Sequence, residues 1–388
     1  MSTIKSISIL GATGSVGAST VDLVRRNPDR FAIKALTANS NVNALAALAR
    51  EFSAEVAVIA DETLYSDLKE ALAGTAVTAL CGTEGLIAAA EVSCDLVMAA
   101  IVGAAGLRPT LAAVRQGKTI ALANKECLVC AGELFMQEAE KSGARILPVD
   151  SEHNAIYQVF DFERATTVEK IILTASGGPF WQKRTDCLKN VTPAEAVAHP
   201  NWDMGQKISV DSATMMNKGL EVIEAFHLFP VQKDQIEVVI HPQSVIHSMV
   251  QYNDGSVLAQ LGSPDMRTPI AYALAWPDRI DAPVPSLSLP ELAQLTFAEP
   301  DLEKFECLKL AMDALHEGGS APLALNAANE VAVEAFLKEK IGFMDISSVV
   351  KATLDKIDMK APHSLSNVFE QDQEARLIAQ NLLTQLAA

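Results

Sequence analysis

The stretch ISILGATGSVG (Ile7–Gly17) decides the fold of the first part of the chain. The apolar run Ile4–Leu10 predicts a strand, Ser15–Arg26 predicts a helix, and glycines stand at their junction. Glycines there permit a tight turn and let backbone N–H groups at a helix N-terminus meet a pyrophosphate. The order strand, turn, helix therefore indicates a dinucleotide-binding unit, although a purely structural turn has the same composition.

The pattern continues to about residue 149. Short apolar runs alternate with longer helical stretches: strands at Phe31–Leu36, Val56–Ile59, Leu96–Ala99 and Thr119–Leu122, and helices at Val42–Glu51, Thr83–Ala90 and Arg108–Arg115. This alternation predicts an α/β domain with a doubly wound, Rossmann-type parallel sheet. The strands are apolar almost throughout, as strands buried on both faces are.

The composition changes after residue 149, and we expect three parts: a nucleotide-binding domain over 1–149, an α+β catalytic domain over 150–276, and a helical domain over 301–388. A proline-rich linker over 277–300 precedes the last part. In the second part we expect strands at Val238–Ile240, Val245–Gln251 and Ser256–Leu261, with Asn253-Asp254-Gly255 as a hairpin turn between the last two.

The acidic composition excludes some functions. Lys and Arg number 31 against 48 Asp and Glu, a formal charge of −17, which repels nucleic acid and anionic lipid. No apolar run reaches the roughly 18 residues of a membrane span, and no signal peptide is expected, so the cytoplasm is the default.

Cys127 and Cys130 have C-x-x-C spacing, which is compatible with a redox pair or with small buried side chains on a helix.

The end of the second strand bears on the cofactor. An NAD enzyme usually places Asp or Glu here to hold the ribose 2′-hydroxyl. This chain has Asn39, Ser40 and Asn41, without an acid. Neutral donors tolerate a 2′-phosphate, so NADP is favoured over NAD.

Two carboxylates follow the apolar run Ile146–Val149. Asp150 and Glu152 would lie on one side of an extended chain, and converging carboxylates repel unless a cation lies between them. Oxygen ligands favour Mg²⁺ or Mn²⁺ over zinc. The alternative is a helix N-cap, with Asp150 or Ser151 capping a helix over Glu152–Gln158.

A second polar cluster runs from Asp211 to Glu221. We expect a helix starting near Ser212, whose hydroxyl would cap it, so that Asn217 and Glu221 share a face. Lys218 would add charge for a phosphate and Glu221 would be a third carboxylate ligand. A solvated ion pair between Lys218 and Glu221 is the alternative.

Two loops complete the set. Ser176 and the following Gly177-Gly178-Pro179 end the strand Ile171–Ala175 and have the composition of an anion-binding nest or of an ordinary tight turn. Ala198–Gly205 contains Trp202 between Pro and Gly residues, which suits a lid that excludes water or a surface loop anchored by Trp202. His241 and His247 flank a turn and are expected to form local hydrogen bonds.

Together these segments closely resemble the 1-deoxy-D-xylulose 5-phosphate reductoisomerase family. The resemblance covers nearly the whole chain in the family's order, at Gly11–Gly17, Met98–Gly106, Ala123–Glu126, Pro148–Asn154, Ser176–Phe180, His199–Gly205, Lys207–Glu221, Ile240–Met249, Pro264–Pro269 and Asn326–Phe336. It implies a homodimer that isomerises a ketose phosphate to a branched aldehyde and reduces it with NADPH to 2-C-methyl-D-erythritol 4-phosphate. A divalent metal (Mn²⁺, Mg²⁺ or Co²⁺) is implied as a second cofactor.

The resemblance also implies the roles of individual residues. The metal ligands would be Asp150, Glu152 and Glu221, and the candidate catalytic residues Lys125, Glu152 and His199. Substrate contacts would come from Lys125, Ser151, Glu152, Ser176, His199, Trp202, Met204, Ser212, Asn217, Lys218 and Glu221. Cofactor contacts would come from Thr13, Gly14, Ser15, Val16, Asn39, Ser40, Asn41, Asn124, Glu126 and Gly205.

The chain departs from the family pattern at two places. Asn39 and Ser40 stand where many members have Gly followed by Lys or Arg, so 2′-phosphate recognition is expected to be weaker or built differently. Cys127 replaces a Ser or Thr. Two other functions remain open: a different NADP-dependent reductase of a phosphorylated carbonyl compound, such as a semialdehyde dehydrogenase, and a nucleotide-sensing regulator on the same fold.

Overall fold

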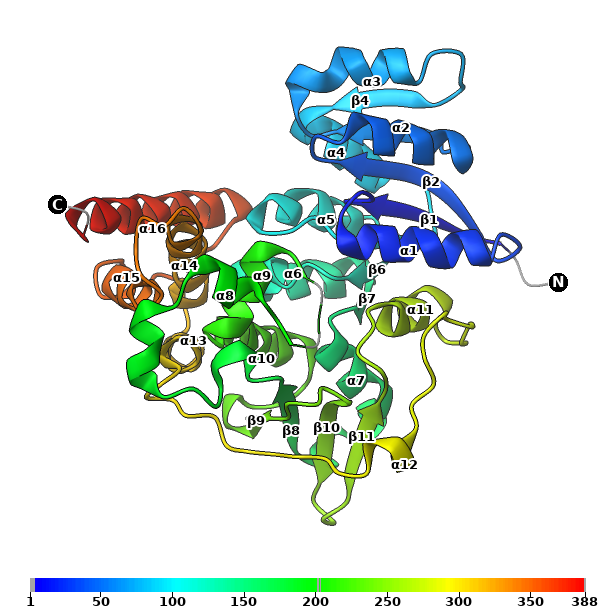
Figure 1. Cartoon of the computed structure of the whole chain (residues 1–388). Coiled ribbons are helices and arrows are strands. Elements are labelled where there is room, and N and C mark those ends of the chain that lie inside the picture. The colour runs from blue at the N-terminus through cyan, green and yellow to red at the C-terminus, as the bar shows by residue number, and fades with distance from the viewer. Residues whose placement is uncertain (1–3, 201, 203, 387–388) are drawn as a thin grey trace. The chain divides into compact units, whose positions relative to one another are not determined.

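The computed structural model describes residues 4–200, 202 and 204–386, and Figure 1 labels its elements. The chain forms two compact units, each with most of its contacts within itself. The first comprises the chain up to Cys127, Phe135–Asn154 and Asp265–Val284, and the second comprises Leu128–Leu134, Ala155–Pro264 and the chain from Pro285 onward. This grouping does not test the three-part division expected from the sequence, which stays a prediction.

The first unit is built on a seven-stranded sheet in the order β4-β3-β2-β1-β5-β6-β7, and all its neighbouring strands are parallel. The strands are β1 (Lys5–Leu10), β2 (Phe31–Ala38), β3 (Val56–Ile59), β4 (Thr78–Cys81), β5 (Leu96–Ala99), β6 (Thr119–Leu122) and β7 (Arg145–Pro148). The expected doubly wound sheet is confirmed. The edge strand β4 escaped sequence analysis because no residue of it is fully buried, so its apolar signal is weak.

Helices flank this sheet (Figure 1). They are α1 (Ser15–Arg26), α2 (Val42–Glu51), α3 (Tyr65–Ala71), α4 (Gly82–Glu91), α5 (Leu107–Arg115) and α11 (Arg267–Ala275), with the 3-10 turns η1 (Glu62–Leu64) and η2 (Ala104–Gly106). The helix α6 (Glu126–Ser142) follows β6, and its residues Leu128–Leu134 belong to the second unit. α2 packs on β2 and β3, α4 on the strands from β1 to β4, and α11 on β6 and β7. The strand order reverses at β1, which pairs with β2 on one side and β5 on the other.

The second unit contains a four-stranded sheet in the order β11-β10-β8-β9. Its strands are β8 (Val168–Ala175), β9 (Ile236–Ile240), β10 (Ile246–Tyr252) and β11 (Val257–Leu261). β8 and β9 are parallel, and β10 is antiparallel to both β8 and β11. The expected hairpin is confirmed: Gly255 has a φ of +86°, the Asp254 carboxylate accepts the N–H of Ser256, and the N–H of Tyr252 donates to Ser256 O.

The remaining elements are mainly helical. They are α7 (Ser151–Val159), α8 (Pro193–Val197), α9 (Gln206–Ala213), α10 (Met216–Leu228), α12 (Leu289–Leu292), α13 (Glu306–Glu317), α14 (Ala321–Leu337), α15 (Asp345–Leu354) and α16 (Leu365–Leu386), with the 3-10 turns η3 (Phe162–Thr167), η4 (Gly178–Phe180), η5 (Thr185–Asn190) and η6 (Lys233–Gln235). The unit boundary at Asn154 falls within α7. None of the helices that the structure describes is both long and apolar enough to cross a membrane.

One core serves the sheet and the C-terminal helices of the second unit. Leu173 of β8, Ile223 of α10 and Leu325 of α14 belong to the same buried cluster. Phe343 packs edge-on against Phe180 at 5.3 Å and against Phe336 at 5.7 Å between ring centroids. Large buried side chains of this kind each contribute about 1.5–3 kcal/mol relative to exposure, so the C-terminal helices and the four-stranded sheet stabilise one another.

Candidate active site

The glycine turn after β1 is closed by backbone contacts. A Cβ at Gly11, whose φ is +89°, would lie 2.6 Å from Ala100 O, and one at Gly17 would lie 2.2 Å from Gly11 O. Both positions therefore require glycine. The N–H of Gly11 donates to the Thr37 hydroxyl at 2.9 Å, which joins the turn to β2.

Four of the predicted cofactor residues lie in this turn and at the start of α1. Thr13 is half-buried, Gly14 and Ser15 are exposed, and Val16 is half-buried in the first turn of α1. Gly14 is the N-cap of α1 and has no side chain over the helix end. The free backbone N–H groups of a helix start attract a phosphate through their partial positive charge.

The end of β2 carries no acid. Asn39, Ser40 and Asn41 are all exposed, so their side chains are accessible to a ligand in solution. Asn41 also has a structural role, because its side-chain oxygen accepts the N–H of Ala44 and caps α2.

The loop after β6 holds Asn124, Lys125 and Glu126 in buried positions. The Asn124 amide donates to the carbonyls of Ile101 and Gly103, and its oxygen accepts the N–H of Cys127. These bonds join the ends of β5 and β6. The Lys125 ammonium forms an ion pair with Asp150 at the end of β7.

Asp150, Ser151 and Glu152 lie at the start of α7. The Asp150 carboxylate accepts the N–H of Ser151 at 3.0 Å, and its backbone oxygen accepts the N–H of Asn154. The Ser151 hydroxyl donates to the Glu152 carboxylate at 2.7 Å. Asp150 therefore contacts the helix start, as the capping alternative expected, while its other carboxylate oxygen faces Lys125.

The cluster from Asp211 to Glu221 differs from the prediction in one respect. Ser212 does not cap a helix but lies in the last turn of α9, and a second helix, α10, begins at Met216. The break occurs at Met215, which has a left-handed φ of +63°. Sequence analysis missed this break because methionine rarely adopts that conformation and carries no breaker signal.

The shared helical face of Asn217 and Glu221 is confirmed. The Asn217 amide donates to one carboxylate oxygen of Glu221, and the Lys218 ammonium contacts the other. The solvated ion pair is wrong, because the side chains of Lys218 and Glu221 are only 4% and 1% exposed. Burying both charges costs desolvation free energy that a surface pair does not lose. An ion pair that bears this cost is more consistent with a functional role than with a purely structural one.

The turn after β8 packs directly on α9. Gly177 and Gly178 have φ of +79° and +63°, and a Cβ at Gly178 would lie 2.7 Å from Ser212 O. The N–H of Gly178 donates to the Ser176 hydroxyl at 3.2 Å. Ser176 and Ser212, which are both among the expected substrate contacts, therefore belong to segments that are in contact.

His199 connects this turn to the predicted lid. Its Nδ1 accepts the N–H of Trp202 at 3.0 Å, so the neutral ring carries its proton on Nε2, which lies 2.9 Å from the Ser176 hydroxyl and donates to it. Burial lowers the pKa of His199 below its usual value and favours this neutral form.

The rest of the lid is partly described. Trp202 and Met204 are half-buried and Gly205 is exposed, while Asn201 and Asp203 lie outside the described residues. The Trp202 ring lies 6.3 Å from the ring of the buried His247. His241 makes an expected local hydrogen bond, because its Nε2 accepts the N–H of Val245 at 3.2 Å. Its Nδ1 also lies 2.9 Å from the distant Thr296 O.

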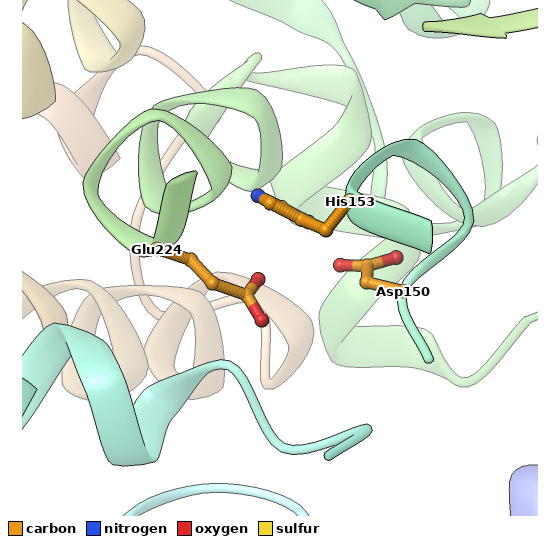
Figure 2. Close-up of side chains that lie close together, drawn as sticks. All are labelled: Asp150, His153 and Glu224. Carbon is orange, nitrogen blue, oxygen red and sulfur yellow. The ribbon is translucent and has the colours of Figure 1, made fainter. Parts of the chain in front are cut away.

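Among the residues that the structure describes, two groups of three side chains offer metal-ligand atoms within 4.8 Å of one another. The first is the predicted set of Asp150, Glu152 and Glu221, whose donors are all carboxylate oxygens. The second combines Asp150 with His153 and Glu224, which Figure 2 shows lying close together. Sequence analysis did not single out His153 and Glu224, although each stands three residues after a predicted ligand, a spacing that keeps two side chains on one helix face.

Cys127 and Cys130 are both buried, as the structural alternative for their spacing expected. None of the six cysteines, all of which lie in the described part of the chain, forms a disulfide bond. Cys130 receives a hydrogen bond from the Asn326 amide at 3.5 Å.

Comparison with known proteins places the chain. The family model described as 1-deoxy-D-xylulose 5-phosphate reductoisomerase matches residues 7–132. The model described as the C-terminal domain of that enzyme matches residues 146–229, and that described as the DXP reductoisomerase C-terminal domain matches residues 261–378. The 1-deoxy-D-xylulose 5-phosphate reductoisomerase of Zymomonas mobilis is 55% identical over the full length of both chains. The chain belongs to the 1-deoxy-D-xylulose 5-phosphate reductoisomerase family.

Other members of this family are equally similar. The reductoisomerase of Rhodospirillum centenum is 58% identical over 98% of this chain and 94% of its own. The solved Zymomonas mobilis enzyme in complex with NADPH is 54% identical, with a TM-score of 0.94 over 98% of this chain and 99% of that one. A DOX-P reductoisomerase in complex with NADPH, fosmidomycin and magnesium is 50% identical, with a TM-score of 0.95 over 99% of each chain. Membership of this family selects the reductoisomerase interpretation over the two alternatives that the sequence left open.

Proposed function

We propose that this chain converts 1-deoxy-D-xylulose 5-phosphate to 2-C-methyl-D-erythritol 4-phosphate, with NADPH as the reductant and a divalent cation bound by Asp150, Glu152 and Glu221. Within the substrate, one carbon–carbon bond breaks and another forms, which gives a branched aldehyde. The aldehyde carbon then receives hydride and its oxygen receives a proton, so each turnover consumes one NADPH and one proton. The observation that carries the metal assignment is the convergence of three carboxylates within 4.8 Å.

The residues at this point fit a hard divalent cation. The first group offers only carboxylate oxygens, the donors that Mg²⁺ and Mn²⁺ prefer and that Co²⁺ also accepts. Three converging carboxylates repel one another unless cations compensate them. A bound cation would supply positive charge to the substrate oxygens on which negative charge develops. The group with His153 includes a nitrogen donor and fits the same ions less well.

Lys125 and Ser151 adjoin two of the proposed metal ligands. Lys125 is buried and paired with Asp150, and we propose that its ammonium, which has three N–H donors, also holds a substrate oxygen. Ser151 holds the Glu152 carboxylate through its hydroxyl. Among the catalytic residues we propose, Lys125 and Glu152 act on the substrate's oxygen atoms and protons.

The phosphate is proposed to bind where α9, α10 and the turn after β8 meet. Hydrogen bonds to the phosphate would come from Ser176, Ser212 and Asn217. Lys218 would supply a local positive charge, which is needed because the net charge of the chain, −17, repels a phosphate. Gly178 brings the turn against Ser212, and His199 orients the Ser176 hydroxyl. The phosphate takes no part in the bond changes, so its binding energy serves to hold the substrate and close the lid.

The lid residues Trp202 and Met204 would cover the substrate and exclude water. Gly205, at the start of α9, is proposed to contact the cofactor. The remaining cofactor contacts are proposed at the turn before α1 (Thr13, Gly14, Ser15 and Val16), at the end of β2 (Asn39, Ser40 and Asn41), and after β6 (Asn124 and Glu126).

A homodimer is the proposed assembly. β11 is an edge strand, and its Val257, Leu258 and Leu261 are 47%, 48% and 37% exposed. Exposed apolar residues on an edge strand favour pairing with a second chain. We also place the enzyme in the cytoplasm, which agrees with six cysteines that form no disulfide bond among the described residues, because thiols stay reduced there.

One assay decides between the two possible metal groups. The purified enzyme is mixed with 1-deoxy-D-xylulose 5-phosphate, Mn²⁺ and NADPH, and nicotinamide absorbance is followed. Glu221→Gln should lower turnover by about 10²–10³-fold, as loss of a comparable charge-stabilising group does, and leave NADPH binding unchanged. Glu224→Gln, on the same helix, is the matched variant. If metal activation is lost in Glu224→Gln and kept in Glu221→Gln, the first group is not the metal site.

A further inference from the structure

Asp211 is a buried carboxylate beside the proposed phosphate site. It lies on α9, directly before Ser212, and is 1% exposed. A buried carboxylate is costly unless charges and hydrogen bonds compensate it. Both of its oxygens are engaged: Lys207 Nζ lies 2.8 Å from Oδ2, and the Asn329 amide donates to Oδ1 at 2.8 Å.

The two partners come from distant parts of the sequence. Lys207 is in the first turn of α9, two residues after Gly205 at the end of the lid. Asn329 is fully buried in the middle of α14, which packs against α9 (Figure 1). The Asp211 carboxylate therefore connects the first turn of α9, next to the predicted lid, with the C-terminal helix α14.

The backbone at Asp211 is part of the junction between α9 and α10. The Thr214 hydroxyl donates to the backbone carbonyl oxygen of Asp211 at 3.2 Å and accepts the N–H of Met216 at 3.3 Å. Met216 is the first residue of α10, which carries Asn217 and Lys218. The left-handed φ at Met215 lies within this bridge. The Asp211 carboxylate holds the end of α9 through Lys207 and Asn329, and Thr214, bonded to the Asp211 backbone, connects α9 to the start of α10.

We propose that Asp211, held by Lys207 and Asn329, is a positioning residue that sets the phosphate-binding groups Ser212, Asn217 and Lys218 for the substrate. This inference rests on the proposed function, which assigns the phosphate to these groups. A buried ion pair contributes little stability beyond an apolar replacement of the same shape. What the network supplies is therefore a defined position for the two helices.

The test is the variant Asn329→Ala, measured by the KM for 1-deoxy-D-xylulose 5-phosphate and the Ki of inorganic phosphate as a competitive inhibitor. Both constants should rise by the same factor, about 10-fold or more, as expected for the loss of a hydrogen bond to a charged group. The Kd for NADPH should not change. Lys207→Met, at a partly exposed position, should act in the same direction and serves if Asn329→Ala does not fold.

The matched control is Asn326→Ala. Asn326 is as fully buried as Asn329 on the same helix, but its amide contacts Cys130 and Glu330. This variant should lower the Tm and leave the KM and the phosphate Ki unchanged. Equal effects of Asn329→Ala and Asn326→Ala on the phosphate Ki, or an effect of Asn329→Ala on the Tm alone, would overturn the inference.

A charge swap provides the rescue. Asn329→Asp places two carboxylates against each other and should weaken phosphate binding more than Asn329→Ala. The double variant Asp211→Asn with Asn329→Asp restores an acid–amide hydrogen bond and should recover the phosphate Ki at least partly.

The variant Lys218→Ala distinguishes failure of the phosphate assignment from failure of this inference. If it leaves the phosphate Ki unchanged, the phosphate assignment and this inference both fail. If it raises the Ki while Asn329→Ala does not, only this inference fails.

Discussion

The Nε2 of His199 lies 2.9 Å from the Ser176 hydroxyl, and the opposite ring nitrogen accepts the backbone N–H of Trp202. One neutral imidazole thus links a proposed phosphate ligand to the tryptophan of the lid. The link needs an unprotonated Nδ1, and burial secures it by lowering the pKa of His199. Phosphate binding and lid position are therefore expected to respond together to changes at this residue.

Lowering the pH should uncouple the lid from the phosphate site. Because the folded pKa of His199 lies below about 6.5, the unfolded chain takes up this proton first. The free energy of unfolding should then fall as the pH drops from about 6.5 to the folded pKa. Protonated Nδ1 no longer accepts from Trp202, so the KM for the substrate should rise over the same range. His199→Gln should reduce the slope of both pH profiles. Part of the slope of the unfolding free energy should remain, because burial also lowers the pKa of His227, to about 4. Unchanged slopes in this variant would assign the titration to other groups.

Gly178→Ala should weaken substrate binding as well as stability. The new Cβ would meet Ser212 O at 2.7 Å, at a φ of +63°, so the turn must move away from α9. Backbone strain of this kind costs about 1–3 kcal/mol, and the KM for the substrate should rise.

Gly255→Ala is the matched control for Gly178. It imposes the same kind of strain, at a φ of +86°, with no atom within 4 Å of the new Cβ. Its Tm should fall while the KM for the substrate stays at the wild-type value. A parallel rise of the KM in both variants would show that instability alone explains the effect.

Asn39→Asp should shift cofactor preference towards NADH. A carboxylate at the end of β2 repels a ribose 2′-phosphate and accepts a bond from a 2′-hydroxyl, so kcat/KM with NADPH should fall about tenfold or more relative to kcat/KM with NADH. Asn41→Asp, at another proposed contact, should shift the preference less, because the side chain at 41 is held by the N–H of Ala44 and aspartate caps α2 as well as asparagine does. A shift in preference at 41 and none at 39 would move the 2′-phosphate contact to Asn41.

Leu258→Glu should convert the proposed dimer to monomers. Leu258 is 48% exposed on the edge strand β11, and a buried, unpaired carboxylate at a subunit contact is strongly unfavourable. Mass measured by light scattering after gel filtration should halve. Leu289→Glu, at a side chain 59% exposed on α12, should leave the mass unchanged. A full-size particle in the Leu258 variant would place the contact elsewhere.

The sequence by itself determined the parts that depend on local patterns. The glycine turn, the buried parallel strands and the Asn253–Gly255 hairpin follow from steric limits on neighbouring residues and from apolar periodicity. The identity of the three proposed metal ligands came from the resemblance to a family, because carboxylates on their own are equally compatible with helix capping.

Only the tertiary structure decided which polar residues share an environment. Lys218 and Glu221 look like a surface pair until packing buries them, and the left-handed Met215 has no sequence signal. Asp211 and Asn329 stand 118 positions apart, and His199 acquires its tautomer from two separate segments. Burial and hydrogen-bond direction depend on contacts between segments that are distant in the sequence, and these contacts form only when the chain folds.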